Sequence, residues 1–406
     1  MVGRNLVVMN VLFLTLVEIN SVEERGIYQD LLRKFRDEGH DVTIVSPVER
    51  RRKITTNLIQ KEGVSLLQVK TLNIQKTHII EKGIGTLAIE YQYLYAIKKF
   101  FPFKKFDLIL YSTPPITLVK VIEYIKNRDG ARTYLLLKDI FPQNAVDMKM
   151  LKKGSFLHQQ FEKKEKKLYH LSDTIGCMSP ANVNFVLNHN PEIERNKVEV
   201  NPNTIEPKDF NFSEAQKIAI RSKYHIPLDK KILVYGGNLG KPQGLDFLLE
   251  TITATTHESL FFLVVGDGTE FSRIQEWFSK TKPLNALLLQ RLPKEDYDQL
   301  LSSCDVGLIF LNKHFLIPNF PSRLLSYLEM KIPVLAATDP HTDIGDIIEN
   351  ANCGYKVLSG NQDEMQFKLH KLLFEDDLEQ LGNNSYALLR KEYLVDRTYN
   401  LIINSF

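Results

Sequence analysis

Short apolar runs alternate with helical segments along almost the whole chain, and this alternation limits the fold more than any other feature. The runs of the first half are VLFLTLV, DVTIVSP, VSLLQVK, DLILYSTP, TYLLLKDI and TIGCMSP. Strands that are separated by helices pair in parallel through right-handed crossovers. The alternation therefore predicts an α/β fold built on a doubly wound parallel sheet.

The same pattern restarts after residues 201–210, a segment rich in proline, asparagine and charge that is typical of a linker. The later runs are KILVYGGN, FFLVVGDG, ALLLQRLP, DVGLIFL, PVLAA and CGYKVL. A chain of 406 residues is also too long for one ordinary core. We expect two tandem Rossmann-like domains, 1–200 and 211–385, that face a central cleft. Residues 386–406 look helical and are expected to cross back to the first domain.

Composition narrows the class of protein. Apolar content of 43% and charged content of 25% are those of a globular protein, and a net charge of +3 is too mild to argue for nucleic acid. Cys177, Cys304 and Cys353 lie far apart, with neither metal-knuckle spacing nor a disulfide framework, which fits a reducing cytosol. Cys177 and Cys304 fall in apolar runs and are expected to be buried.

The apolar run from Leu6 to Val17 has two interpretations. Its length matches the apolar part of a signal peptide, and it also matches a buried first strand. Asn10 interrupts the run, no small-residue cleavage site follows, and an amphipathic helix begins next. These features favour the strand.

The segment from Pro318 to Ala337 is expected to form a loop, a helix and a buried strand. Free backbone N–H groups and the helix dipole at such a junction favour an anion, and Arg323 adds a full positive charge. Phosphate is the natural ligand. The alternative is that Leu324, Leu325 and Leu328 simply pack this helix on its sheet.

Three more loops of the second domain follow strands: Tyr235–Gly244, Val265–Phe271 and Gln290–Tyr297. Their glycines let a backbone approach a ligand, although turns also use glycine for other reasons. Together the loops predict a nucleotide site, with the base near 266–268 and 291–293 and the diphosphate near 237–241 and 322–323. The candidate binding residues in this domain are Gly237, Asn238, Lys241, Gly266, Gly268, Arg291, Leu292, Asn319, Ser322, Arg323, Leu324 and Glu329.

The order of GGNLGKPQG, GDG, LP before a helix, CDVGL and a Ser-Arg-Leu-Leu helix before KIPVLAA resembles a known family. It is similar to the nucleotide-sugar domain of retaining GT-B glycosyltransferases of family 4, in the bacterial branch that builds capsule and O-antigen polysaccharides. EERGIYQDLLRKFRDEGHDVTIVSP and KDIFPQNAVDM extend the resemblance over the first half. It implies sugar transfer from a UDP-linked donor to a saccharide carried on a polyprenyl-diphosphate lipid, with retention. It implies no metal and no cofactor, because the nucleotide sugar is a substrate.

Two departures from the family pattern affect the site. Many members carry two glutamates before the Pro-Val strand, where this chain has Pro318 and Ser326. They also often carry an arginine and a lysine in the first loop of this domain, where this chain has Asn238 and Gln243. The usual sugar and ribose contacts therefore cannot be carried over. The available substitutes are Lys241, Arg323 and Glu329.

In the first domain the resemblance points to Gly26, whose backbone would face the donor diphosphate, and to Arg25, which would balance charge on the leaving phosphate. Glu24 belongs to the same candidate catalytic group. The alternative is a capped helix in which the neighbouring glutamates complement the dipole. Asp139 ends the run TYLLLKDI and could orient a hydroxyl or take a proton, or it could cap the following turn.

Basic and aromatic residues gather at 50–53, 91–105 and 149–170. They suit either an anionic membrane surface or ordinary solvated helix faces. The resemblance favours a cytoplasmic protein at the inner face of the membrane. The rival functions are a nucleotide-sugar epimerase or hydrolase and a non-catalytic binding partner. A nicotinamide enzyme is disfavoured because no G-x-G-x-x-G opens the first βα unit.

Overall fold

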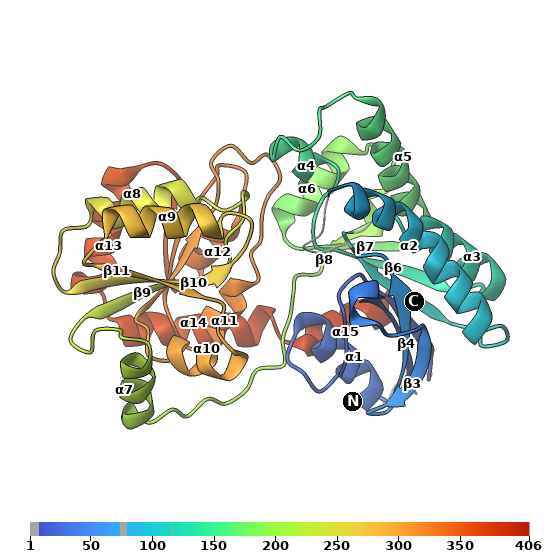
Figure 1. The fold of residues 1–406 in the computed structure, drawn as a ribbon, viewed down its shortest axis with the longest axis horizontal. Helices are drawn as coiled ribbons and strands as arrows, with labels where there is room; N and C mark the ends of the chain where they lie inside the picture. The colour runs from blue at the N-terminus through green and yellow to red at the C-terminus, as the bar shows by residue number, and fades with distance from the viewer. Residues whose placement is uncertain (1–7, 74–78, 115, 406) are drawn as a thin grey trace. The chain divides into compact units, whose positions relative to one another are not determined.

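The structure is a computed structural model of the chain that describes residues 8–73, 79–114 and 116–405. The chain divides into two compact units (Figure 1). Unit 1 comprises residues 1–206 and 395–406, and unit 2 comprises residues 207–394. Each unit is an α/β sandwich around its own sheet, so each is described by itself.

Unit 1 has an eight-stranded sheet among its described residues, in the order β3-β4-β2-β1-β5-β6-β7-β8. All neighbours pair in parallel except β3 and β4. The central strand β1 sets the register, with Val11 opposite Val42 of β2 and Leu108 of β5. The strands are β1 Asn10–Leu14, β2 Asp41–Glu49, β3 Asn57–Lys61, β4 Val64–Thr71, β5 Leu108–Ser112, β6 Arg132–Leu137, β7 Thr174–Cys177 and β8 Val198–Val200.

The helices of unit 1 lie on both faces of this sheet (Figure 1). They are α1 Ile27–Asp37, α2 Ile79–Phe100, α3 Val119–Asp129, α4 Gln143–Asp147, α5 Phe156–Leu171, α6 Pro180–His189 and α15 Val395–Asn404. One core joins α1 and α15 to the sheet through Phe35, Tyr399 and Ile402, which are all nearly inaccessible to solvent. The C-terminal helix α15 is therefore part of unit 1.

Unit 2 has a six-stranded, fully parallel sheet in its described residues, in the order β11-β10-β9-β12-β13-β14. This order is that of the doubly wound dinucleotide-binding fold, with the first strand at the centre. The strands are β9 Lys231–Asn238, β10 Leu260–Asp267, β11 Ala286–Gln290, β12 Val306–Phe310, β13 Val334–Thr338 and β14 Gly354–Leu358.

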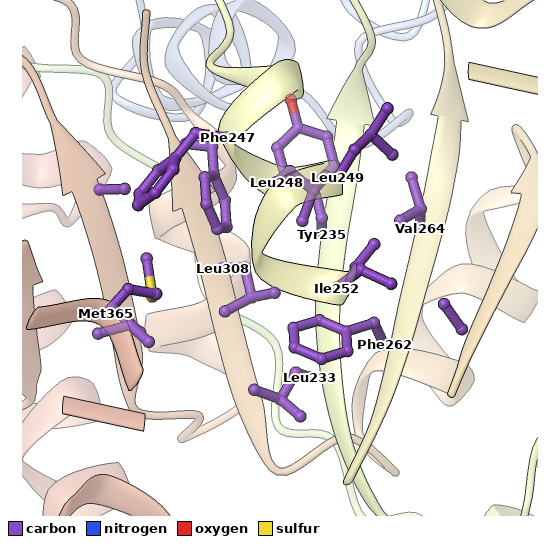
Figure 2. Close-up of a cluster of buried hydrophobic side chains, with 14 of the residues drawn as sticks. Leu233, Tyr235, Phe247, Leu248, Leu249, Ile252, Phe262, Val264, Leu308 and Met365 are labelled. Atoms are coloured by element: carbon purple, nitrogen blue, oxygen red, sulfur yellow. The ribbon is translucent and has the colours of Figure 1, made fainter. Parts of the chain in front are cut away.

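Helices cover both faces of the second sheet, with α8 and α9 on one side and α10, α11 and α14 on the other (Figure 1). They are α7 Glu214–Lys223, α8 Leu245–Ala254, α9 Phe271–Thr281, α10 Lys294–Leu301, α11 Arg323–Glu329, α12 Ile344–Asn350, α13 Gln362–His370 and α14 Leu378–Glu392. Figure 2 shows the core beneath α8, where Phe247 and Ile252 meet Leu308 and Phe262 of the strands. Tyr235 of β9 lies in the same cluster.

Local signals explain several helix boundaries. Ser213 caps α7 and forms a capping box with Gln216, while Ser179 caps α6 ahead of Pro180. Gly130 ends α3 in the left-handed conformation. Serine before the first turn, proline at its start and glycine after the last turn are the residues that helix ends favour.

Every apolar run named above forms a strand, and Asn10–Leu14 confirms the buried first strand within the described residues. Residues 1–7, which include the beginning of the Leu6 run, lie outside them. Cys177, Cys304 and Cys353 are free and buried, as expected for the first two. The amphipathic pattern after the Leu6 run predicts a helix from about Glu23 to Glu38, and its start was wrong, since α1 begins at Ile27.

Candidate functional site

The carboxyl ends of β9 and β12 form the switch point of the second sheet. β9 pairs with β10 over its whole length but with β12 only at Leu233 and Val234. Beyond these positions the strands separate. In open α/β sheets this is where ligands bind.

Tyr327 of α11 fills the space between the separated strands. Its buried hydroxyl accepts a hydrogen bond from Gly236 N at 3.1 Å and lies 3.1 Å from the carbonyl oxygens of Val234 and Leu308. Gly307 must be small here, because a Cβ on it would lie 2.5 Å from the Tyr327 ring. Helix α11 is thus fixed against both strands, and Arg323 at its start is held at the switch point.

Arg323 is the central side chain of this edge. Its guanidinium lies 4.1 Å above the centre of the Tyr235 ring, a cation–π contact. Nη2 donates to Gln243 Oε1 at 2.9 Å and to Asn238 O at 3.4 Å. Nη1 is buried and has no hydrogen-bond partner in the described part of the chain.

All of these contacts are neutral, so the charge of Arg323 is not balanced within the protein. No carboxylate among residues 8–73, 79–114 and 116–405 lies within salt-bridge distance of it. A partly buried charge without a partner is costly, and so is a buried N–H without an acceptor. An anion at Nη1 would satisfy both.

Glycine is required at three positions of the neighbouring loops for different structural reasons. Gly237 has φ +115°, a backbone conformation that favours glycine, and a Cβ built on it would lie 3.8 Å from the Arg323 guanidinium, an ordinary contact distance. Gly266 and Gly268 instead pack against backbone, since a Cβ would lie 1.9 Å from Gly237 O or 2.3 Å from Leu239 O. Loop packing therefore accounts for these two, and only Gly237 borders the guanidinium.

Of the other candidate residues of unit 2, two make hydrogen bonds within the protein and the rest are exposed or half-buried. Asn238 borders Arg323 through its carbonyl. Asn319 donates its N–H to Thr342 Oγ1 at 3.0 Å. Lys241, Arg291 and Ser322 are exposed, and Leu292 is half-buried.

Two residues of α11 do not fit the predicted site. Leu324 is fully buried, and its N–H donates to Pro321 O at 3.2 Å, so neither group can reach a ligand. Glu329 is buried six residues, or about 9 Å, along the helix from Arg323 and accepts from Lys208 N at 2.9 Å. A structural role, holding the linker segment at Lys208, accounts for Glu329.

The predicted helix N-terminus also carries less weight than its sequence indicated. Helix α11 spans only seven residues, and Ser322 makes no capping hydrogen bond with its side chain. The dipole of so short a helix attracts an anion only weakly, and only at its first turn. The case for an anion here therefore depends on the Arg323 side chain.

Asp139 is the candidate of unit 1 with the most distinctive environment. Asn144 Nδ2 donates to Asp139 Oδ2 at 2.5 Å, and Thr113 Oγ1 accepts from the backbone N–H groups of Lys138 and Asp139 at 3.1 and 3.3 Å. Burial raises the pKa of Asp139 to about 6, and the hydrogen bond from Asn144 acts in the opposite direction. Asn144 Oδ1 is buried without a partner in the described residues. The carboxylate can therefore gain or lose a proton near neutral pH.

Sequence reasoning missed Lys138, the neighbour of Asp139. Its ammonium group reaches Asn201 O at 3.4 Å, and burial lowers the pKa of Lys138 to about 7. The sequence placed this lysine at the end of a predicted strand, but lysines are mostly exposed, so a surface position was the default expectation. Lys138 and Asp139 are therefore an adjacent base and acid with shifted pKa values at the carboxyl end of β6.

The loop after β1 does not have the predicted form. Gly26 has extended backbone with φ 171°, and its N–H donates to Asp30 Oδ1 at 3.3 Å, so this N–H is not free to face a diphosphate. Glu24 is exposed and Arg25 is half-buried in the loop before α1. Strand β5 lies between β1 and β6, which separates this loop from Asp139 by about 10 Å at the level of the strands.

The chain is similar in sequence to proteins that are named glycosyltransferases. Residues 216–387 match the family described as "Glycosyl transferases group 1". The chain is 21% identical over 368 residues to the probable glycosyltransferase WbjE of Pseudomonas aeruginosa, covering 90% of this chain and 89% of that one. It is 25% identical over 266 residues to the putative colanic acid biosynthesis glycosyl transferase WcaI of Escherichia coli K12, covering 63% and 64%.

A solved structure resembles the whole chain. Anabaena HepE in complex with UDP matches with a TM-score of 0.68 and 13% identity, over 98% of this chain and 99% of that one. The chain therefore has the GT-B fold, which confirms the fold class expected from the sequence. The matches together support a glycosyltransferase.

Proposed function

We propose that this protein transfers a sugar from a nucleoside-diphosphate donor, UDP-linked, to a saccharide acceptor during the synthesis of a surface polysaccharide. The observation that carries the proposal is Arg323, a partly buried cation at the switch point with no charge to balance it. A diphosphate supplies that charge. The UDP bound to HepE and the description of WcaI as a colanic acid biosynthesis glycosyl transferase support the donor and the pathway class.

In this proposal Arg323 acts on the leaving group. Breaking the bond between the sugar and the nucleotide builds negative charge on the diphosphate oxygen. A fixed guanidinium in a site of low polarity stabilises that charge without reorganising. Its stacking on Tyr235 and its hydrogen bond to Gln243 hold it in place before the substrate arrives.

Asp139 is proposed to act on the acceptor. With a pKa near 6, its carboxylate is ionised at neutral pH and can accept a hydrogen bond from an acceptor hydroxyl. Retention at the anomeric carbon and independence from a metal are proposed from the resemblance of the sequence.

A lipid-linked acceptor calls for a membrane-facing surface, and residues 149–157, which run into the start of α5, offer one. Met150, Phe156 and Leu157 are 64%, 78% and 52% exposed, and residues 149–153 include three exposed lysines. This mixture suits an anionic bilayer surface. Met150 N donates to Ala145 O of α4, so this segment adjoins the helix that carries Asn144. None of the described helices is long and apolar enough to cross a membrane.

A panel of UDP-, GDP- and dTDP-sugars tests the donor site through thermal stabilisation. We expect at least one to raise the melting temperature of the wild-type protein. Arg323→Ala should weaken its binding about 10- to 100-fold, the range for a lost hydrogen bond to a charged group. Lys280→Ala, which removes a charge from the exposed side of α9, is the matched control and should bind normally. Unchanged affinity in Arg323→Ala would refute the site.

A further inference from the structure

Gln243 lies beside Arg323 and is held there by its backbone. It forms an isolated antiparallel bridge with Leu311, just past the end of β12, and its N–H donates to Gly240 O at 3.0 Å. The residue as a whole is only 8% exposed. Gln243 therefore occupies a fixed position between the loop after β9 and the end of β12.

The hydrogen bonds of Gln243 determine which way its carboxamide faces. Oε1 accepts from Arg323 Nη2 at 2.9 Å and lies 3.3 Å from the Tyr235 hydroxyl. The guanidinium can only donate, so the oxygen must point toward it, and the Tyr235 hydroxyl also lies 3.0 Å from Asn238 O. The Nε2 group then points the other way, and it has no hydrogen-bond partner within the described residues.

Two neighbouring donors are thus left without protein acceptors: Arg323 Nη1 and Gln243 Nε2. We infer that Gln243 orients the Arg323 guanidinium and donates from Nε2 to the same bound diphosphate. This inference deepens the proposed function and rests on it for the identity of the anion. It assigns a binding role to Gln243, which the sequence marked only as a departure from the lysine that many members of the resembled family carry.

The neutral amide is essential to this arrangement. A carboxylate at position 243 would form an ion pair with Arg323. The positive charge of the guanidinium would then be neutralised and would attract a bound anion less. An apolar side chain of similar size would remove both the acceptor for Nη2 and the donor for the anion. Glutamine supplies both and leaves the positive charge of Arg323 available.

Calorimetric titration with UDP, and separately with inorganic diphosphate, tests the inference on the full chain. We expect Gln243→Glu to weaken both ligands about 100-fold and Gln243→Leu to weaken them about tenfold. Gln275→Glu makes the same charge change on the exposed side of α9 and should leave both affinities unchanged. Gln243→Leu keeps the test valid if the glutamate variant does not fold.

The outcomes separate this inference from the proposed function. Acceptor-dependent sugar transfer with UDP affinities within twofold of wild type in both Gln243 variants would overturn the inference alone. Binding of inorganic diphosphate that is lost in Gln243→Glu, without turnover of any nucleotide sugar, would sustain the anion site and refute the transferase. A wild-type protein that binds neither ligand would overturn both.

Discussion

Asp139 is a single side chain whose ionisation should govern both stability and turnover. Its pKa rises from 3.8 to about 6 on folding, because burial penalises the carboxylate. The folded state therefore prefers the protonated form, and stability is lost as pH rises from about 4 through about 6. Asp139→Asn removes this cost and can still accept from Asn144.

We predict that Asp139→Asn gains up to about 3 kcal/mol in unfolding free energy at pH 8 and nothing at pH 3.5. Nucleotide binding should be retained while turnover is lost. In the wild type, turnover should fall below about pH 6. Urea unfolding at the two pH values measures the first effect, and a variant no more stable than wild type at pH 8 would contradict the assignment.

Residue roles were predictable from sequence only where chemistry and position coincided. Arg323 and Gly237 stood out because a cation and a glycine follow strands. Leu324 could not be separated from Arg323 by sequence, since the face of a helix that turns inward depends on its packing. Tyr235 was missed because a tyrosine in an apolar run carries no functional signal of its own. Gln243 was noted only as a departure from the family's lysine, because a loop glutamine does not by itself indicate a binding role.

At the scale of elements, periodicity predicted the strands that form both central sheets. It missed β3, whose exposed polar residues weaken the alternation, and β8, which has only three residues. The late start of α1 has a distant cause, because Glu62 accepts hydrogen bonds from Ser21 Oγ at 2.7 Å and Val22 N at 2.9 Å. A contact about forty residues away leaves no mark on the local sequence.

Helix α15 contacts the rest of unit 1 through His40, and the hydrogen bonds of His40 show which ring nitrogen carries its proton. Met9 N donates to His40 Nδ1 at 3.1 Å, so His40 is neutral and its Nε2 proton faces Tyr399 Oη at 2.9 Å. Burial lowers the pKa of His40, against the opposing effect of Glu38. Protonation would break the Met9 bond, so the stabilisation is present above the unfolded pKa of about 6.5 and is lost as pH falls below it.

We predict that the contribution of His40 to stability, measured as the unfolding free energy of the wild type minus that of His40→Gln, decreases between pH 7 and pH 5. Tyr399→Phe should cost about 1 kcal/mol at pH 7, the usual value of one buried hydrogen bond. Chemical denaturation across the pH range tests both effects. An equally steep pH dependence in His40→Gln would exclude this histidine as the source.

At the scale of the whole molecule, two units carry complementary chemistry. Unit 2 presents an uncompensated guanidinium at its switch point, and unit 1 presents a carboxyl and an amine with shifted pKa values at its carboxyl edge. The tandem architecture followed from the repeated alternation in the sequence. The end of unit 2 did not, because the sequence showed one helical segment at 386–406 where the structure has α14 and α15 in different units.

Release of UDP from a UDP-sugar, measured with and without a lipid-linked saccharide acceptor, tests the central claim most directly. The account predicts that release requires the acceptor, that the sugar appears on the acceptor with its anomeric configuration retained, and that Arg323→Ala and Asp139→Asn each abolish it. UDP release at the same rate without acceptor would contradict the account and identify a hydrolase.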